Sequence, residues 1–136
     1  MSLRLVLDSN ALISLFDDSD DGVKKALMKA SEVLIPIVAY AEVISGAENK
    51  TKRAVATLEA MDVLLKMPGT RIVPVTVDTA RHYSRIFNQL KSSGRQIPTN
   101  DIWVAATVFE TRGTLYSADG HFENVPLLDW IDGRCA

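Results

Sequence analysis

The sequence predicts an α/β fold, in which a mainly parallel central sheet of about five strands is flanked by helices on both faces. Short β-branched or leucine-rich runs alternate along the chain with longer segments of helical periodicity. This alternation is typical of a parallel sheet covered by helices. The length of 136 residues, 47% of them hydrophobic, suits a single domain over residues 1–136 that buries its own core.

The first half of the chain contains two predicted strands, each followed by a helical segment. The strands are Arg4–Leu7 and Val33–Pro36. A second apolar run, from Ala11 to Phe16, follows the first strand, and Val23, Leu27 and Ala30 then repeat at helical spacing. The stretch IPIVAYAEVISG continues from the second strand as a helix that we expect to be buried. A further helix is indicated by the spacing of its apolar residues, which are Val55, Leu58, Met61, Leu64 and Leu65.

The second half repeats the alternation with three more predicted strands, Arg71–Thr76, Thr114–Ser117 and Pro126–Leu128. Between them lie two helices: one runs from Asp78 to about Ser92, and the other ends near Thr111. The second helix follows the loop GRQIPTN, where the proline disfavours helix just before it and Thr99 or Asn100 is a suitable N-cap.

Composition excludes several classes of protein. The formal net charge of −2 argues against a nucleic-acid binder that relies on bulk positive charge. Two histidines and one cysteine are too few for a zinc site, so a bound metal would need oxygen ligands. The lone Cys135 cannot form an internal disulfide, and no apolar run is long enough to span a membrane. We therefore expect a cytoplasmic protein that does not insert into membranes.

Four carboxylates stand out by their surroundings. Asp8 ends the first strand, Glu42 interrupts an apolar helix, Asp101 lies in the first turn of the helix after IPTN, and Asp119 begins the turn SADGHF. Each has a structural explanation by itself: helix capping for Asp8, the helix dipole for Asp101, a turn for Asp119 and a solvent-facing position for Glu42.

The predicted topology changes this interpretation when the four acids are taken together. In an open parallel sheet, ligands bind beyond the carboxyl ends of the strands, where Asp8 and Asp119 both lie. Carboxylates about 4 Å apart repel each other by roughly 4 kcal/mol at an effective dielectric constant near 20. Either some carboxyls are protonated or a divalent cation neutralises them, and oxygen ligands select Mg²⁺ or Mn²⁺.

Four segments in this order resemble the PIN domain, and most closely the VapC-type toxins of bacterial and archaeal toxin–antitoxin pairs. The segments are LVLDSNALIS, PIVAYAEVISG, IPTNDIWVAAT and TLYSADGHFENV. Each motif is weak alone, but the ordered set is specific and covers essentially the whole chain. The resemblance implies a Mg²⁺- or Mn²⁺-dependent endoribonuclease that binds one or two ions per subunit.

The resemblance also implies roles for individual residues. Its acidic positions carry over to Asp8, Glu42, Asp101 and Asp119, with Asp8 as the central ligand and Glu42 as a ligand or a group that positions water. Accessory roles around the metal are implied for Ser9, Asn10, Asn100 and Ser117. His121 departs from the acidic or polar residues common in the family, and we interpret it as a surface turn residue, with substrate contact as the alternative.

The implied partners are RNA, a small VapB-like antitoxin that fills the acidic groove, and a second copy of the chain. The dimer would use the helical segment Lys52–Met67, whose apolar residues also suit the core. Candidate residues for contact with RNA lie on two basic segments, and for each of them a solvated helix face is the alternative. They are Lys50, Lys52, Arg53, Arg81, Arg85, Lys91 and Arg95. The acidic run at residues 17–21 is expected to be a solvated loop and helix start.

Other classes fit the sequence less well. A haloacid-dehalogenase phosphatase needs a second aspartate two residues after the first, where Asn10 stands, and a phospho-accepting receiver needs a lysine at the end of a late strand. Nucleotide-binding glycine motifs are absent. Two alternatives stay open: a PIN-like RNA-binding or regulatory module without turnover, and a housekeeping RNA-processing nuclease.

Overall fold

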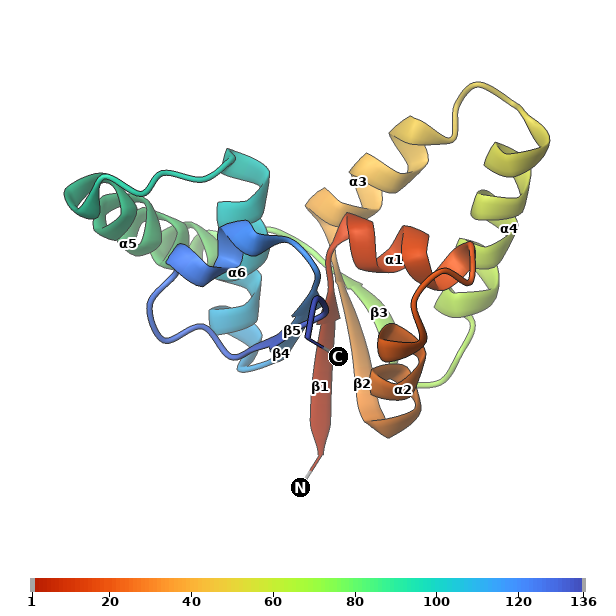
Figure 1. The fold of residues 1–136 in the computed structure, drawn as a ribbon, viewed down its shortest axis with the longest axis horizontal. Helices are drawn as coiled ribbons and strands as arrows, with labels where there is room; N and C mark the ends of the chain where they lie inside the picture. The colour runs from red at the N-terminus through yellow and green to blue at the C-terminus, as the bar shows by residue number, and fades with distance from the viewer. Residues whose placement is uncertain (1, 136) are drawn as a thin grey trace.

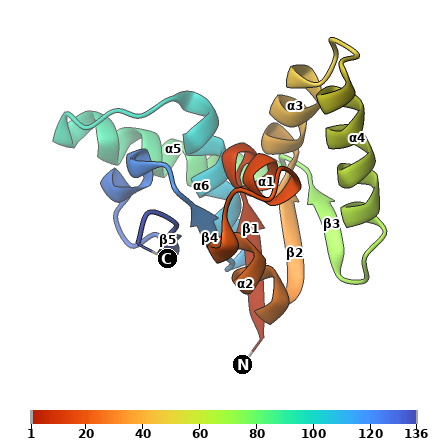
Figure 2. The ribbon, with the colours of Figure 1, turned by 45° about the vertical axis from the view of Figure 1, so that its right-hand side comes forward.

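The computed structural model describes residues 2–135, and its centre is a parallel sheet. The strands within this range are β1 (Leu3–Leu7), β2 (Ala30–Pro36), β3 (Thr70–Val73), β4 (Thr114–Ser117) and β5 (Trp130–Asp132). They are ordered β3-β2-β1-β4-β5, and each neighbouring pair is parallel. The chain adds strands on one side of β1 first and then crosses to the other, as Figure 2 shows. The carboxyl ends of β1 and β4 therefore flank a topological switch point, which is the usual ligand position in such sheets.

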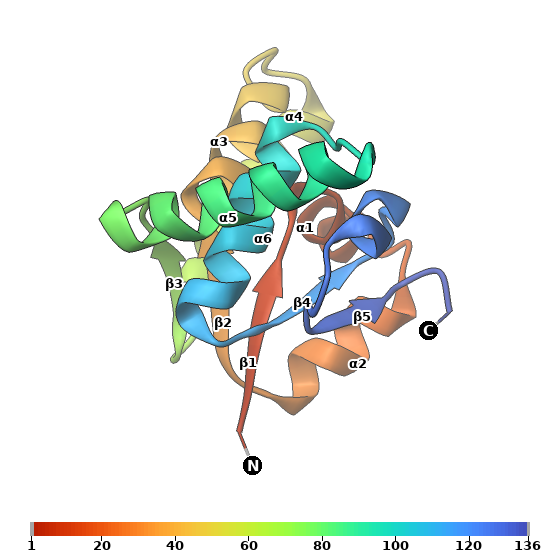
Figure 3. The same cartoon turned by 90° about the vertical axis from the view of Figure 1, so that its left-hand side faces the viewer.

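Helices cover both faces of the sheet, as predicted (Figure 1). They are α1 (Ser9–Phe16), α2 (Asp21–Lys29), α3 (Ile37–Gly46), α4 (Lys52–Leu65), α5 (Val77–Ser93) and α6 (Thr99–Thr111). A short 3₁₀ helix, η1 (Gly120–Asn124), connects β4 to the last segment. Figure 3 shows α5 and α6 lying across one face, and α1 to α4 cover the opposite face.

Alternation along the strands builds one core on each face. Val6, Leu34 and Leu115 point toward α5 and α6 and are fully buried there. Their neighbours in the strands point the other way, so Leu5 and Ile35 pack against α1 to α4. Since successive side chains of a strand face opposite sides, continuous apolar strands are what a sheet covered on both faces requires.

Three predicted boundaries are wrong. The last strand is Trp130–Asp132 rather than Pro126–Leu128, because Leu127 adopts a left-handed backbone (φ 63°) that cannot continue a strand. The third strand ends at Val73, immediately before Pro74, which has no amide hydrogen for the ladder. Ala30 leaves the helical pattern and begins β2, so α2 ends at Lys29.

The predicted cap of α6 is also wrong. Helix α6 begins at Thr99, and the capping position belongs to Pro98, which makes no side-chain hydrogen bond. The acidic run behaves as expected: residues 17–19 are exposed, and Asp20 caps α2 by accepting a 2.8 Å hydrogen bond from the Gly22 amide. Within residues 2–135, no helix is both long and apolar enough to cross a membrane.

Candidate metal centre at the carboxyl edge of the sheet

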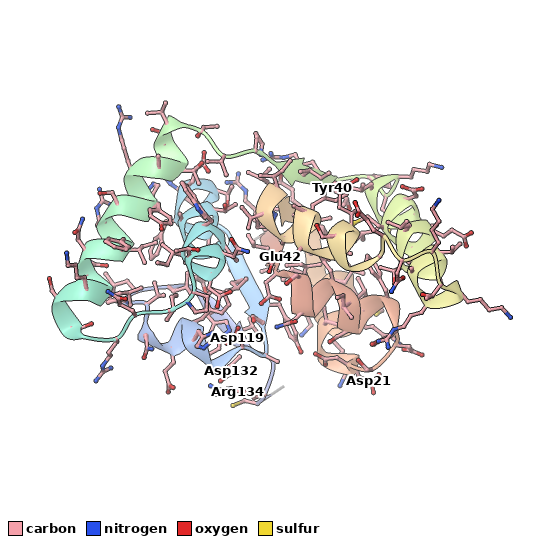
Figure 4. All side chains as sticks on the ribbon, turned by 90° about the horizontal axis from the view of Figure 1, so that it is seen from above. Asp21, Tyr40, Glu42, Asp119, Asp132 and Arg134 are labelled. Carbon is pink, nitrogen blue, oxygen red and sulfur yellow. The ribbon has the colours of Figure 1, made fainter. Side chains whose placement is uncertain are left out.

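The four predicted acids line one cleft of about 290 Å³ at the carboxyl edge of the sheet. The complete lining is Asp8, Ser9, Asn10, Glu42, Pro98, Thr99, Asn100, Asp101, Val104, Asp119 and His121. Three of the four predicted accessory residues are therefore also present. Figure 4 shows Glu42 and Asp119 in the middle of the molecule, between the α5–α6 pair and the helices on the other face. Side chains distant in sequence converge here because β1, β4 and the starts of α1 and α6 meet at the switch point.

Asp8 combines the capping role and the cleft position that the sequence left as alternatives. Its Oδ1 accepts a 2.8 Å hydrogen bond from the Ala11 amide, which caps α1. Its Oδ2 accepts a 2.5 Å hydrogen bond from the Ser117 hydroxyl at the end of β4. Only 4% of Asp8 is exposed. Both carboxylate oxygens are thus oriented by the backbone elements that form the site.

Ser117 lies beneath the cleft and connects two of the acids. Its Oγ donates to Asp8 and accepts a 3.0 Å hydrogen bond from the Asp119 amide. The carbonyl oxygen of Ser117 accepts hydrogen bonds from the Trp130 indole at 3.0 Å and from the Gly133 amide at 2.8 Å. The serine is fully buried and does not line the cleft itself. We therefore interpret it as a positioning residue for the acids.

Asp101 and Asp119 meet at the imidazole of His121. The Nδ1 atom of His121 lies 3.0 Å from Oδ2 of Asp101 and 3.0 Å from Oδ1 of Asp119. Asp119 also caps η1, since its Oδ1 accepts a 2.9 Å hydrogen bond from the His121 amide. The interpretation of His121 as a surface turn residue is therefore incomplete: it is exposed and lies in a turn, but it bridges two candidate ligands. Its spacing of two residues from Asp119 was the signal for this contact.

Burial and mutual repulsion make the charged forms of two of the acids, Asp8 and Asp101, less favourable. Burial, together with smaller contributions from the charges of Asp101 and Asp119, raises the pKa of Asp8 to about 6, although the hydrogen bonds from Ser117 and Ala11 lower it. Burial also raises the pKa of Asp101, together with the charge of Asp119. The hydrogen bond to Asp101 and the charge of Asp119 raise the pKa of His121 above its ordinary value. A site with these shifts favours a bound positive charge.

Glu42 differs from the expectation of a buried helix. Helix α3 buries Ala39 and Val43, whereas Glu42 is exposed and Ile37 is 40% exposed. The glutamate nevertheless lines the cleft. Helix α3 packs one face against the core, and Glu42 lies on an adjacent face that borders the cleft. This arrangement explains why the helix is mostly apolar and has a single acid.

The donor set suits a hard divalent cation. Asp8, Glu42, Asp101 and Asp119 offer carboxylate oxygens, and the amide and hydroxyl side chains of Asn10, Ser9 and Asn100 surround them. Ligand atoms from Asp101, Asp119 and His121 all lie within 4.8 Å of one another. Oxygen-rich sites of this kind are typical of Mg²⁺ and Mn²⁺.

This combination of fold and acidic cleft matches a known class of protein. The sequence profile described as PIN domain matches residues 5–128. The chain therefore belongs to the PIN domain family.

Similar proteins come from several bacteria. The chain is 24% identical over 131 residues to Ribonuclease VapC1 of Haemophilus influenzae strain R2866, covering 93% of this chain and 96% of the relative. It is equally similar, with the same coverage, to the protein of that name from strain 86-028NP.

Solved structures share the fold. VapBC2 from Rickettsia felis, bound to a promoter DNA fragment, has a TM-score of 0.81 at 20% identity and covers 95% of this chain and 98% of that one. VapBC-1 from nontypeable Haemophilus influenzae has a TM-score of 0.81 at 22% identity, with 97% and 99% covered. FitAcB from Neisseria gonorrhoeae has a TM-score of 0.80 at 20% identity, with 98% and 100% covered.

Proposed function

We propose that this protein is a Mg²⁺- or Mn²⁺-dependent endoribonuclease and the toxin of a toxin–antitoxin pair. The observation that carries the proposal is the convergence of Asp8, Glu42, Asp101 and Asp119 on one cleft. Membership of the PIN family and similarity to proteins named Ribonuclease VapC1 support RNA as the substrate. Residues 1–136 are proposed to act as one domain, since both cores pack on the same five strands. The proposed location is the cytoplasm, where the proposed RNA substrate is found.

The acids would hold one or two ions. Asp8 is the proposed central ligand, Asp101 and Asp119 hold one side, and Glu42 ligates directly or orients the attacking water. When bound, a divalent ion offsets the negative charge of the phosphodiester and lowers the pKa of water. The raised pKa of Asp8 and its burial support this assignment, because a cation would relieve the cost of the buried charge.

The remaining polar groups are proposed to position the acids and the RNA backbone. Ser117 fixes the orientation of Asp8 through its 2.5 Å hydrogen bond, so that Asp8 does not need to reorganise during the reaction. Helix α6 starts without a side-chain cap, which leaves amide groups of its first turn available to a phosphate oxygen. Ser9, Asn10 and Asn100 line the cleft and can hydrogen-bond ligand or water.

Basic side chains outside the cleft would attract the RNA backbone. Two of the predicted residues form exposed ion pairs: Arg53 with Asp17 at 3.6 Å, and Arg81 with Asp78 at 3.1 Å. These two are weaker candidates because a nearby carboxylate already neutralises them. The remaining candidates are Lys50, Lys52, Arg85, Lys91 and Arg95. Phosphate contacts of this kind make RNA binding weaken as salt rises.

The proposed protein partners are a VapB-like antitoxin and a second copy of this chain. The similar VapBC structures from Rickettsia felis and Haemophilus influenzae support the antitoxin. Helix α4 leaves Val55, Leu58 and Val63 exposed by 47%, 38% and 65%, which supports the Lys52–Met67 segment as a contact surface. Exposed apolar side chains on a helix favour association with another apolar surface.

The first experiment measures cleavage of a single-stranded RNA oligonucleotide by the purified protein with Mg²⁺, with Mn²⁺ and with EDTA. The expected result is cleavage to 5′-phosphate and 3′-hydroxyl ends with either ion and none with EDTA. Asp8→Asn and Asp101→Asn should abolish cleavage, whereas Glu48→Gln, at an exposed position after α3, should leave it unchanged. Full activity of a folded Asp8→Asn protein would contradict the assignment.

A second experiment separates the proposal from its two alternatives. Expression of the chain in bacteria should arrest growth, and the Asp8→Asn variant should not. A protein that binds the RNA but never cleaves it, with any divalent ion, would be the RNA-binding module without turnover. RNA cleavage without growth arrest, from a gene with no small DNA-binding-type reading frame beside it, would favour a housekeeping nuclease.

A further inference from the structure

His121 places one nitrogen atom against two candidate metal ligands that come from separate elements. Asp101 lies in the first turn of α6, and Asp119 follows β4. Nδ1 of His121 lies 3.0 Å from a carboxylate oxygen of each. The side chains of Asp101 and Asp119 are 18% and 21% exposed, whereas that of His121 is 51% exposed. The imidazole therefore covers the outer side of the acid pair.

The backbone fixes this position. The His121 amide donates a 2.9 Å hydrogen bond to Asp119 Oδ1, and the next residue, Phe122, is only 1% exposed. Phe122 packs in the core beneath α5 and α6. The backbone of His121 is thus fixed by the hydrogen bond to Asp119 on one side and by the buried side chain of Phe122 on the other. This backbone position favours the contact of the His121 imidazole with the two carboxylates.

The spacing of the three atoms corresponds to that of ligands around one ion. Adjacent ligands of an octahedral ion, each about 2.1 Å from the metal, lie about 3.0 Å apart. Both distances from Nδ1 to a carboxylate oxygen are 3.0 Å, and all three ligand atoms lie within 4.8 Å of one another. Little rearrangement would be needed to direct them at a shared cation.

We propose that His121 is a metal ligand through Nδ1, beside Asp101 and Asp119, and that it shifts the site toward Mn²⁺ over Mg²⁺. The proposal rests on the metal-dependent function proposed above and adds a nitrogen ligand to an otherwise all-oxygen set. A nitrogen ligand favours first-row transition-metal ions over Mg²⁺, which prefers oxygen and gives up water reluctantly. The ligating ring carries its proton on Nε2, and the half-exposed side chain allows water to accept that hydrogen bond.

The competing explanation is that Nδ1–H only donates hydrogen bonds to the two carboxylates. The two explanations predict opposite effects of removing the ring. A ligand that is removed weakens ion binding, whereas removal of a hydrogen-bond donor that competes for the same oxygens strengthens it. Metal affinity of an alanine variant therefore decides between them.

The test measures Mn²⁺ binding to the full chain by electron paramagnetic resonance, with Mg²⁺ as the competitor. His121→Ala should lower Mn²⁺ affinity by about tenfold or more, as loss of groups supporting a metal site does, and Mg²⁺ affinity by much less. Pulsed spectra of bound Mn²⁺ should show histidine nitrogen coupling that disappears in His121→Ala. The matched control is His82→Ala, because His82 is the other histidine of the chain and stacks on Phe109. This control should keep both the affinity and the nitrogen signal.

The outcomes separate the two proposals. Tight Mn²⁺ binding without nitrogen coupling in the wild type, or His121→Ala binding Mn²⁺ as well as or better than wild type, overturns the ligand assignment and leaves the nuclease proposal standing. Absence of Mn²⁺ and Mg²⁺ binding in the wild type, or binding that Asp101→Asn does not weaken, overturns the metal centre itself. Thermal melting tests whether each variant is folded. His121→Ala should melt as a folded protein, because His121 is exposed.

Discussion

Replacement of Asp8 by asparagine should stabilise the metal-free protein while it removes the proposed activity. The Asp8 carboxyl is 4% exposed, and burial raises its pKa from 3.8 to about 6. Between these two pH values, the unfolded chain ionises this carboxyl while the folded protein keeps its proton. The folded state therefore loses stability as pH rises, and the full loss, about 3 kcal/mol, is present above pH 6.

Asparagine removes this loss because it carries no charge. It keeps an oxygen that can accept from the Ala11 amide, but its other side presents an amide group to the Ser117 hydroxyl, where Asp8 accepted a hydrogen bond. Loss of that hydrogen bond should offset about 1 kcal/mol. The expected net gain is about 2 kcal/mol at pH 7.5, or roughly 5–10 °C in melting temperature for a chain of this length.

The assay is thermal and urea unfolding in EDTA at pH 7.5, 5 and 4, with Glu48→Gln as the exposed control after α3. The gap between Asp8→Asn and wild type should narrow as pH falls from 6, close near about pH 4.5 and be slightly reversed at pH 4, where only the lost hydrogen bond remains. The control should stay within about 0.5 kcal/mol of wild type. Saturating Mn²⁺ should reverse the order, because ion at about 100 times its Kd adds about 2.7 kcal/mol to a protein that binds it. The argument would be refuted if Asp8→Asn were no more stable than wild type at pH 7.5. It would also be refuted if the difference in unfolding free energy did not change with pH.

Two further predictions concern the fold. Tyr116→Phe removes a hydroxyl that donates to both carboxylate oxygens of Asp20, at 3.1 and 2.9 Å, and should lower the free energy of unfolding by about 1 kcal/mol in urea; an unchanged value would show that this contact contributes nothing. Gly69→Ala should lower the melting temperature, because Gly69 has φ 80° and a Cβ there would lie 2.8 Å from the Ser31 carbonyl oxygen. Gly46→Ala, with nothing within 4 Å, is its control and should be neutral or slightly stabilising; equal melting temperatures for the two variants would contradict the steric reasoning.

The sequence determined the class of fold and the identity of the acids. Apolar strands alternating with helical repeats predict a covered parallel sheet, and the sheet is parallel throughout. The convergence of Asp8 and Asp119 followed from their places after two strands, since carboxyl ends of parallel strands share an edge. These features are local in sequence and need only the regular geometry of strands and helices, which is why they could be predicted.

The tertiary structure decided what depends on contacts between distant residues. The hydrogen bond from Ser117 to Asp8 joins positions 109 residues apart, and its geometry is set by the pairing of β4 with β1. The exposed place of Glu42 on the rim and the contact of His121 with Asp101 also depend on how whole elements pack. Residue types and spacing do not determine the distances between these side chains. The distances are set only when the helices pack on the sheet and the two cores form. The sequence therefore identified the candidate ligands, and the packed sheet determined which atoms face one another.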